Sequence, residues 1–357
     1  MNVRSVHQIP PQNDNPRNSE GAFLRGKNGE ILFAYSRYHG ESNHDHAACD
    51  IALIVSHDEG ESWSEPRMIA TAAEFGTKNI MSVSALEQKD GKLAFYFLIK
   101  ENDMSTTMGR VLSADGEVWQ SERCRFDAVP AGYYVVNNDR IVRLSDGRLI
   151  APAAVCSIDV IRNHSKGKAL MMDATALVSQ DDGKTFSCVP WIFSVNDPAP
   201  WMRGYEEPGI IEYDDRLYYW IRTCFGRQYE SISYNGMNGF GEPRPSEFTS
   251  PRSPMQIKAF DGVAYAIYNP TPDYDGRKAL ESSWGRTPLV LRKSTDDGKS
   301  WGTVNIIEDD PARGYCYPAV FKTRDESLLL AYCRGGAEDG SVLCRLGISK
   351  IEISSIQ

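Results

Sequence analysis

The stretch Ser56-His57-Asp58-Glu59-Gly60-Glu61-Ser62-Trp63 follows the pattern Ser-x-Asp-x-Gly-x-x-aromatic. Two further copies run from Ser179 to Phe186 and from Ser294 to Trp301. Each copy follows a short apolar run typical of a strand, so the pattern is expected on the turn that leaves that strand. Asp can accept hydrogen bonds from the backbone of its own turn, and Gly can adopt a positive φ. A repeated hairpin unit is therefore predicted.

Two weaker copies of the pattern fill the gaps, beginning at Ser113 and Ser233. The five copies thus begin at 56, 113, 179, 233 and 294, which gives steps of 57, 66, 54 and 61 residues. That spacing fits one four-stranded propeller blade with a long loop. After Trp301 the chain has enough strand-like sequence for a sixth sheet. We predict an all-β fold: a six-bladed β-propeller of four-stranded antiparallel sheets, closed by joining both chain ends in one sheet, with residues 1–357 as a single domain.

Composition agrees with a packed β domain. Of the 357 residues 41% are hydrophobic, enough for a large core, and 29 Gly with 19 Pro supply many turns. No segment reaches the roughly 18 consecutive apolar residues of a membrane span, so none is predicted. The net charge of −9 argues against nucleic acid as a partner, whereas a small anionic substrate remains possible because local arginines can dominate a pocket.

Cysteine usage and the N-terminus bear on location. The eight cysteines have no CxxC and no metal-ligand spacing, so buried free thiols in a reducing compartment are expected. Met1 to Gln12 contains no apolar run after a basic segment, so no secretory signal is predicted. We therefore expect a cytoplasmic protein, with secretion after removal of a leader as the alternative. The sequence does not indicate an oligomeric state.

The repeated pattern resembles the Asp-box (BNR) repeat of the sialidase superfamily, and the resemblance covers nearly the whole chain. It implies a propeller whose boxes lie on the outer rim, away from any ligand. Members of that family bind the carboxylate of a sugar acid with three arginines. They use a Tyr nucleophile paired with a Glu, and an Asp on a loop as acid and base. The resemblance implies no metal and no cofactor.

The first candidates for these roles lie near the first predicted blade. Arg17 precedes its first strand, at the position of an arginine motif in sialidases, although the Ile-Pro that follows in the family is missing. Arg37, at the end of the strand 31–36, matches a second family arginine. Asp45 follows eight residues later and is the predicted general acid/base, with Asp50 and Glu41 as rivals.

The second group lies in the later blades. Glu207, in the sequence Tyr-Glu-Glu-Pro-Gly, is followed by Arg222 at the spacing of the family's Glu-strand-turn-strand-Arg hairpin, short by one residue in the turn. Glu207 is the predicted partner of the nucleophile, with Glu206 as the competitor. Arg222 and Arg286 are the second and third carboxylate-binding arginines that the resemblance implies; Arg286 opens the strand that runs into the last full copy of the repeat.

Two tyrosines compete for the position of the nucleophile. Tyr315 falls 29 residues after Arg286, close to the family's spacing, and is the predicted nucleophile. Tyr317 has the same strand parity and is the alternative; it is otherwise expected to contact the substrate. A true pair must bring the Tyr oxygen and the Glu oxygen within about 2.6–3.2 Å of each other.

These residues predict a retaining, sialidase-like exo-glycosidase acting on a terminal acidic sugar. A neutral Tyr avoids the repulsion between a carboxylate nucleophile and an anomeric carbon that already bears a carboxylate, but it needs a base because phenols titrate near pH ~10. An additional Asp that many sialidases carry near the second blade, where it contacts the sugar, has no clear equivalent within 79–86. Recognition of the glycerol and N-acetyl groups is therefore unsupported, and another 2-keto-3-deoxy acid or a uronate is open as substrate. The alternatives are a propeller glycosidase or lyase for another anionic glycan, in which His44 and His46 would suit proton abstraction, and a non-catalytic carbohydrate-binding propeller.

Overall fold

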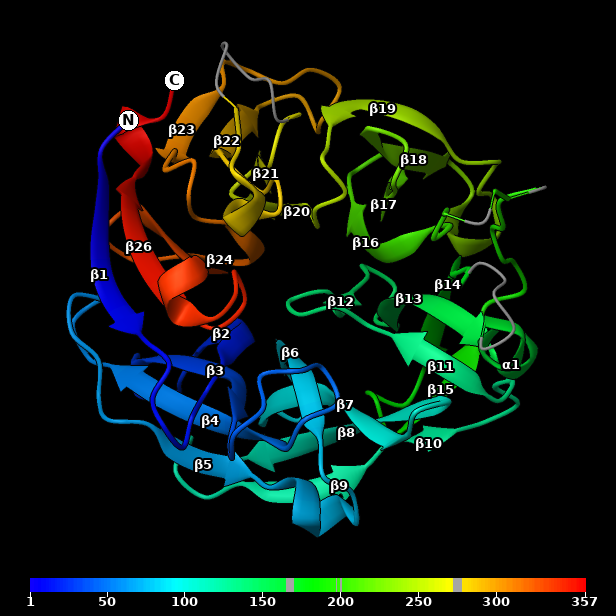
Figure 1. Ribbon diagram of the computed structural model, residues 1–357, viewed down its shortest axis with the longest axis horizontal. Coiled ribbons are helices and arrows are strands. Elements are labelled where there is room, and N and C mark those ends of the chain that lie inside the picture. The colour runs from blue at the N-terminus through cyan, green and yellow to red at the C-terminus, as the bar shows by residue number, and fades with distance from the viewer. Residues whose placement is uncertain (165–169, 197, 200, 272–277) are drawn as a thin grey trace.

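A computed structural model describes residues 1–164, 170–196, 198–199, 201–271 and 278–357. Its strands form six sheets that stand side by side in a ring around a central axis (Figure 1). Five of the sheets have four antiparallel strands, and the third has additional strands. The predicted all-β, six-bladed propeller is therefore confirmed.

The blades follow one another along the chain. The first blade contains β2 (Asn18–Arg25), β3 (Ile31–Tyr38), β4 (Cys49–Ser56) and β5 (Arg67–Ala70), and the second contains β6 (Ile80–Glu87), β7 (Leu93–Asn102), β8 (Ser105–Ser113) and β9 (Gln120–Arg123). The third contains β11 (Gly132–Val135), β12 (Val142–Arg143), β13 (Leu149–Ser157), β14 (Asp173–Ser179) and β15 (Thr185–Cys188), with β10 (Arg125–Phe126) pairing in parallel at its outer edge. A short helix, α1 (Ile158–His164), follows β13.

The remaining blades keep the same order. The fourth contains β16 (Glu206–Glu212), β17 (Leu217–Arg222), β18 (Arg227–Ser233) and β19 (Arg244–Thr249), and the fifth contains β20 (Gln256–Phe260), β21 (Val263–Tyr268), β22 (Leu289–Ser294) and β23 (Asn305–Glu308). The sixth contains β24 (Cys316–Lys322), β25 (Ser327–Cys333), β26 (Leu346–Glu352) and, at its edge, β1 (Val3–Ile9). Short 3₁₀ turns among the described residues include Ala72–Phe75, Gly236–Asn238, Glu281–Ser283, Ala337–Asp339 and Ile353–Ser355.

The two chain ends close the ring. Strand β1 pairs antiparallel with β26, from Val3 opposite Ile351 to Ile9 opposite Leu346 (Figure 1). The sixth sheet therefore needs residues from both ends of the chain, as the sequence predicts. Closure of this kind leaves no unpaired blade at either end of the array.

The repeated pattern forms the turn between the third and fourth strands of a blade. In the first copy, the Oγ of Ser56 accepts a hydrogen bond from the backbone N–H of Gly60 and donates one to Asp58, both at 2.8 Å. The indole of Trp63 donates to the Gly60 carbonyl at 3.2 Å. The serines of the copies at 179 and 294 make the same two contacts. Each serine thus fixes its turn from inside, which explains the fixed spacing of Ser, Asp and Gly.

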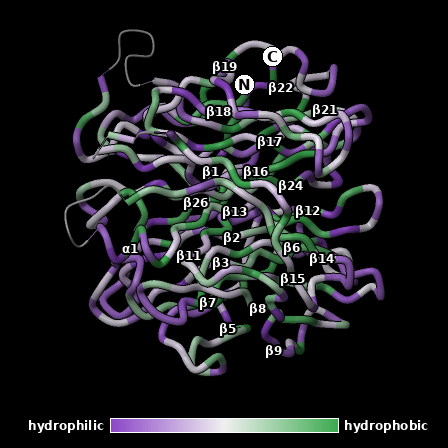
Figure 2. Tube along the Cα trace, turned by 90° about the vertical axis from the view of Figure 1, so that its right-hand side faces the viewer, coloured by the Kyte–Doolittle hydropathy of each residue, from purple (hydrophilic) through white to green (hydrophobic). Residues whose placement is uncertain are grey.

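Hydrophobic packing lies between neighbouring blades. Each of the six interfaces holds one cluster of buried apolar side chains. Strand β7 illustrates why its sequence is almost continuously apolar: Phe95 and Phe97 pack toward the first blade, whereas Tyr96 and Leu98 pack toward the third. Figure 2 shows the hydrophobic segments within the blades and hydrophilic segments in many of the peripheral loops. Among the described residues, no helix is long and apolar enough to cross a membrane.

Candidate active site

A cavity of about 390 Å³ opens between the first strands of four blades. Its wall includes Glu20 of β2, Ser82 of β6, Glu207 of β16 and Tyr317 of β24. These four strands surround the centre of the ring (Figure 1). The cavity therefore collects polar side chains from both halves of the chain at one place.

Each of those four residues lies in a β-bulge of its strand. The pairing of the first strand with the second shifts at Ser19/Ala22, Met81/Ser84, Glu206/Gly209 and Cys316/Ala319. Within each shift the cavity residue has a positive φ: 56° at Glu20, 64° at Ser82, 41° at Glu207 and 56° at Tyr317. Such β-bulges re-aim a side chain and are common beside active sites. A non-glycine residue in this backbone region costs about 1–3 kcal/mol, so the surrounding sheet must hold it there.

The bulge in β16 depends on a glycine two residues after Glu207. A Cβ added to Gly209 would lie 2.1 Å from the indole ring of Trp220. Trp220 is almost completely buried and donates a hydrogen bond to the Met255 carbonyl at 3.0 Å, so it cannot move aside easily. Only glycine allows the backbone to approach this closely.

Tyr317 and Glu207 form a direct hydrogen-bonded pair. The phenol oxygen of Tyr317 donates to Oε1 of Glu207 at 2.9 Å. The other carboxylate oxygen accepts a hydrogen bond from Nη1 of Arg222, which also lies 3.5 Å from the Tyr317 oxygen. Burial raises the pKa of the Tyr317 phenol well above its ordinary value, and the negative charge of Glu207 adds to that shift. The phenol is therefore neutral at rest and has a carboxylate in place to take its proton.

Two buried arginines stand on the Tyr317 side of the cavity. The guanidinium of Arg286 lies over the ring of Tyr317, 5.5 Å from its centroid, and donates a hydrogen bond to the sulfur of Cys316 at 3.1 Å. Arg222, at the end of β17, faces Glu207 directly across the hairpin. Both are only 7% exposed, so their charges act with little screening by water. An anionic group bound beside Tyr317 would meet both positive charges.

A third buried arginine lies on another wall, with two carboxyl groups. Nη1 of Arg17 contacts Asp45 at 2.5 Å, and its Nη2 lies 3.7 Å from Glu20. Lys100 approaches from β7 and donates a hydrogen bond to the backbone carbonyl of Asp45. Desolvation alone would raise the pKa of the Asp45 carboxyl, but Arg17 and Lys100 outweigh it and lower that pKa to about 2. Burial raises the pKa of Glu20 to about 7 despite the opposing charge of Arg17.

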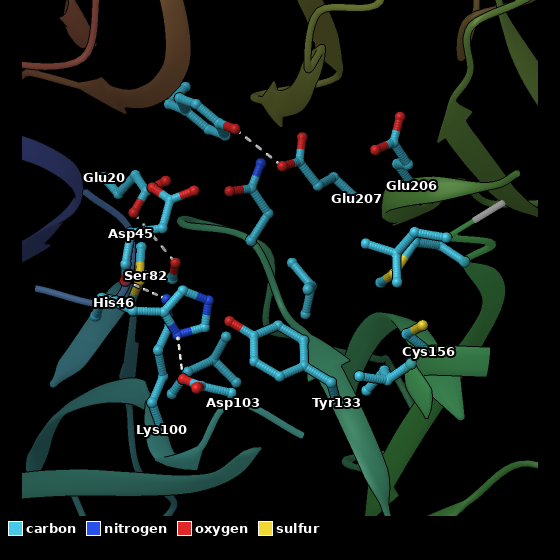
Figure 3. A pocket seen from close by; sticks show the side chains of 18 of the residues that line it. Glu20, Asp45, His46, Ser82, Lys100, Asp103, Tyr133, Cys156, Glu206 and Glu207 are labelled. Atoms are coloured by element: carbon cyan, nitrogen blue, oxygen red, sulfur yellow. Dashed lines mark hydrogen bonds and ion pairs between the residues drawn. The ribbon is translucent and has the colours of Figure 1, made fainter. Parts of the chain in front are cut away.

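The remaining wall of the cavity is largely apolar. Met81 and Leu98 come from the second blade, and Ile161 of α1 lies with Leu170 and Met172 near the third. Tyr133 of β11 also lines this part (Figure 3). The cavity thus has an ionic half around Tyr317 and an apolar half opposite, as expected for a site that orients one charged group of a ligand and excludes water from the rest.

Of the predicted site residues, Asp45, Glu207 and Tyr317 line the cavity. The three predicted carboxylate-binding arginines lie behind its wall, each against one of these lining residues: Arg17, Arg222 and Arg286.

Tyr315 does not reach the cavity. The Tyr315 side chain is 1% exposed and packs against Tyr332 and Leu289 in the hydrophobic cluster between the fifth and sixth blades. Tyr315 and Tyr317 share strand parity, yet the bulge at Tyr317 breaks the alternation of side chains. The predicted choice of Tyr315 is therefore corrected to the alternative, Tyr317, which meets the distance criterion with Glu207.

Arg37 also stays away from the cavity. It follows Ser36 on β3 and precedes Tyr38, whose ring lies under the guanidinium of Arg17 at 4.4 Å. Successive residues of a strand point to opposite faces, so Arg37 is directed away from Arg17. Its predicted role in substrate binding has no support in the geometry.

The rivals considered from sequence have other partners. Asp50 accepts a hydrogen bond from the backbone of Ala72 at 2.7 Å and pairs with His39 at 3.2 Å. Glu41 is exposed on the loop between β3 and β4. Glu206 does line the cavity, but both its oxygens are held by Arg252 at 2.8 Å. Of these two sets, Asp45 is the carboxyl group that reaches the cavity beside Arg17, and Glu207 is the glutamate that is hydrogen-bonded to Tyr317.

Sequence reasoning missed the part that Glu20 and Lys100 play in the cavity. Lys100 lies in an apolar strand and carries no recognisable signal. A signal for the bulges did exist: proline follows both Glu207 and Tyr317, and proline inside a first strand marks a bulge or an edge. That rule would have selected Tyr317 over Tyr315 and Glu207 over Glu206.

The histidines of the β3–β4 loop lie at the rim. His44 and His46 stack with their ring centroids 5.7 Å apart, and Nδ1 of His46 lies 3.4 Å from Asp103 (Figure 3). Burial lowers the pKa of His46. Among the described residues no cluster of three or more His, Cys, Asp or Glu side chains is arranged to hold a metal ion.

Fold and site together define a six-bladed propeller with a cavity lined by ionisable side chains at its axis. Residues 31–330 match the BNR repeat-like domain family, and the chain belongs to it. A comparison with curated proteins finds no match.

Solved structures with the same fold include sialidases. The chain is similar to the Hadza microbial sialidase Hz136 over 96% of its own length and 66% of that protein's, with a TM-score of 0.73 and 14% identity. It is similar to Trypanosoma rangeli sialidase in complex with 2,3-difluoro-KDN over 99% and 58% of the two chains, with a TM-score of 0.68 and 13% identity. A protein of unknown function from Dyadobacter fermentans matches over 98% and 99%, with a TM-score of 0.70 and 16% identity. At these identities the likeness establishes the fold alone.

Proposed function

We propose that the protein is a retaining exo-glycosidase of the sialidase type, which releases a terminal acidic sugar from a glycan. The observation that carries this proposal is the contact of 2.9 Å between the Tyr317 phenol and Glu207 inside the cavity. A buried tyrosine bonded to a carboxylate is a nucleophile with its base already in place. The fold, which is that of known sialidases, supports the same assignment.

The substrate class follows from the charges beside that pair. Arg222 and Arg286 are buried, planar cations that can bind a carboxylate through paired, charge-assisted hydrogen bonds. A carboxylate attached to the anomeric carbon would place that carbon next to Tyr317. Glu207 is already oriented to take the phenolic proton, because its Oε1 accepts the hydrogen bond from Tyr317 and its second oxygen is held by Arg222.

The reaction proceeds in two displacements. Glu207 takes the phenolic proton while the Tyr317 oxygen attacks the anomeric carbon, and a carboxyl group of the Arg17 wall protonates the departing glycosidic oxygen. In the second displacement the carboxylate of the Arg17 wall takes a proton from water as the water oxygen attacks the anomeric carbon, and the Tyr317 oxygen leaves and recovers its proton from Glu207. Asp45 is the residue expected from the sequence for the acid/base role. The configuration at the anomeric carbon is retained after two inversions.

The test is turnover of a panel of aryl α-glycosides of sialic acid, KDN and other acidic sugars. We expect the wild type to hydrolyse at least one, Arg286→Ala to lose about 10²-fold or more in kcat/KM, and the exposed-loop control Glu41→Gln to match the wild type. An unsaturated or anhydro product would indicate a lyase instead. Binding of the sugars without any turnover would indicate a non-catalytic lectin-like propeller.

A further inference from the structure

We propose that Glu20, and not Asp45, donates the proton to the leaving group. This inference rests on the proposed glycosidase function and names a further catalytic residue for it. Glu20 sits on the β2 bulge, lines the cavity and is almost completely buried, whereas Asp45 is 59% exposed and bonded to Arg17. Both carboxyl groups lie on the same wall, across the cavity from Glu207 (Figure 3).

Arg17 contacts the two carboxyl groups differently. Its Nη1 makes a short ion pair with Asp45, at 2.5 Å, which an ionised carboxylate favours. Its Nη2 lies 3.7 Å from Glu20, too far for a hydrogen bond, and finds no other hydrogen-bond partner. The Arg17 guanidinium therefore stabilises the ionised form of Asp45 strongly and the ionised form of Glu20 only weakly. When two acidic groups share one site, the more buried of them keeps its proton.

The other groups around Glu20 also favour a protonated Glu20 beside an ionised Asp45. Ser82 lies within 3.3 Å of its Oε2, and the charged groups that act on it are Arg17, Asp45, Lys100 and Glu207. Two of these are carboxylates, which oppose a second negative charge nearby. Burial raises the pKa of Glu20 to about 7, whereas Arg17 and Lys100 hold that of Asp45 near 2. The weakly acidic groups around Glu20 are Tyr38, Tyr133, Tyr317, Cys49 and Cys333.

With Glu20 as the acid and then the base, every proton in the two displacements is accounted for. In the first displacement the Glu20 proton passes to the glycosidic oxygen as its bond to the anomeric carbon breaks, and the alcohol departs. In the second, the Glu20 carboxylate takes a proton from the attacking water, which returns it to its starting state. Asp45 stays ionised throughout and holds Arg17 in position, so Asp45 acts as a positioning residue.

Leaving-group dependence tests the proposal. The wild type, Glu20→Gln, Asp45→Asn and the control Glu41→Gln are compared on aryl glycosides with an activated leaving group, such as dinitrophenol, and a poor one, such as phenol. We expect Glu20→Gln to lose about 10²-fold or more on the poor leaving group and less than about 10-fold on the activated one. The alkaline limb of the wild-type pH profile, expected near pH 7, should disappear in Glu20→Gln. An unchanged ratio in Glu20→Gln, with the selective loss in Asp45→Asn instead, overturns the proposal.

A second readout does not depend on turnover. Infrared difference spectra of the wild type minus Glu20→Gln should contain a protonated carboxyl band at pH 5 that vanishes as the pH rises through 7. A Glu20 already ionised at pH 5 contradicts the proposal whatever the substrate. If Glu20→Gln does not fold, Glu20→Asp serves in the kinetic experiment, because it withdraws the carboxyl group by one methylene. A wild type that turns over no acidic glycoside would refute the proposed function while the infrared result still decides the state of Glu20.

Discussion

The repeated turns and the bulges of the first strands are two recurring features of the same blades, and they differ in almost every property. The turns carry a conserved spacing of Ser, Asp and Gly, and their hydrogen bonds close within eight residues. The bulges share only a backbone shape, and each presents a different side chain to the cavity: Glu20, Ser82, Glu207 or Tyr317. Repetition of sequence therefore marks the scaffold here, whereas repetition of backbone geometry with varied side chains marks the site.

Removing the phenol at a bulge should have the largest effect. Tyr317→Phe deletes the oxygen that Glu207 contacts, so we expect kcat/KM to fall by at least about 10³-fold on any substrate that the wild type hydrolyses. Tyr315→Phe, two residues earlier and packed in a hydrophobic cluster, should retain activity close to that of the wild type. Steady-state kinetics of the two purified variants measure this contrast. Equal losses of kcat/KM in both variants would mean that the position of Tyr317 on the bulge does not distinguish its role from that of Tyr315.

The carboxyl group of Glu20, on the β2 bulge, should also make the stability of the protein depend on pH. The pKa of Glu20 is raised to about 7 in the folded protein, against an ordinary value near 4.5. The unfolded chain therefore ionises first, and this group destabilises the fold progressively as the pH rises from about 4.5 to 7, by up to about 3 kcal/mol. Urea unfolding at pH 4.5 and pH 8 should show a larger loss for the wild type than for Glu20→Gln. Identical pH dependence in the two proteins would argue that Glu20 is ionised in the fold.

Substitutions in the turns should lower stability by a smaller amount and should leave catalysis unchanged. Ser56→Ala removes the acceptor of the Gly60 N–H and the donor to Asp58, which should cost about 1–2 kcal/mol. Ser294→Ala removes the same pair of contacts in the fifth blade. Thermal or urea unfolding measures the loss, and kcat/KM should remain at the wild-type value. A turn variant that folds normally but loses activity would undermine the separation of scaffold and site.

The sequence predicts the scaffold well because the turns are local. A pattern of eight residues closes its own hydrogen bonds, so its copies and their spacing lead directly to six blades and to the joining of the chain ends. Glu207, Arg222 and Arg286 are also predictable, because each has a fixed place on a hairpin or at the start of a strand. Tyr315 was preferred to Tyr317 because its spacing from Arg286 is close to that of the family, and strand alternation alone places both tyrosines on the same face.

The rest of the site depends on contacts between distant segments. Whether Glu20 is buried follows from Ser82 of the next blade and from Arg17, and neither contact is visible in the local sequence. Arg37 was misplaced because position along the chain does not say which face of β3 it occupies. Lys100 reaches Asp45 across 55 residues of sequence, a proximity that only the packing of two blades creates.

The most direct test of the central claim is to trap the covalent intermediate on Tyr317. The protein is incubated with 2,3-difluoro derivatives of sialic acid, of KDN and of other acidic sugars, and the digested product is analysed by mass spectrometry. We expect one sugar adduct, located on the phenol oxygen of Tyr317 and lost in Tyr317→Phe but not in Tyr315→Phe. An adduct on Tyr315 or on a carboxylate, or turnover of an acidic glycoside with no adduct on Tyr317, would contradict it.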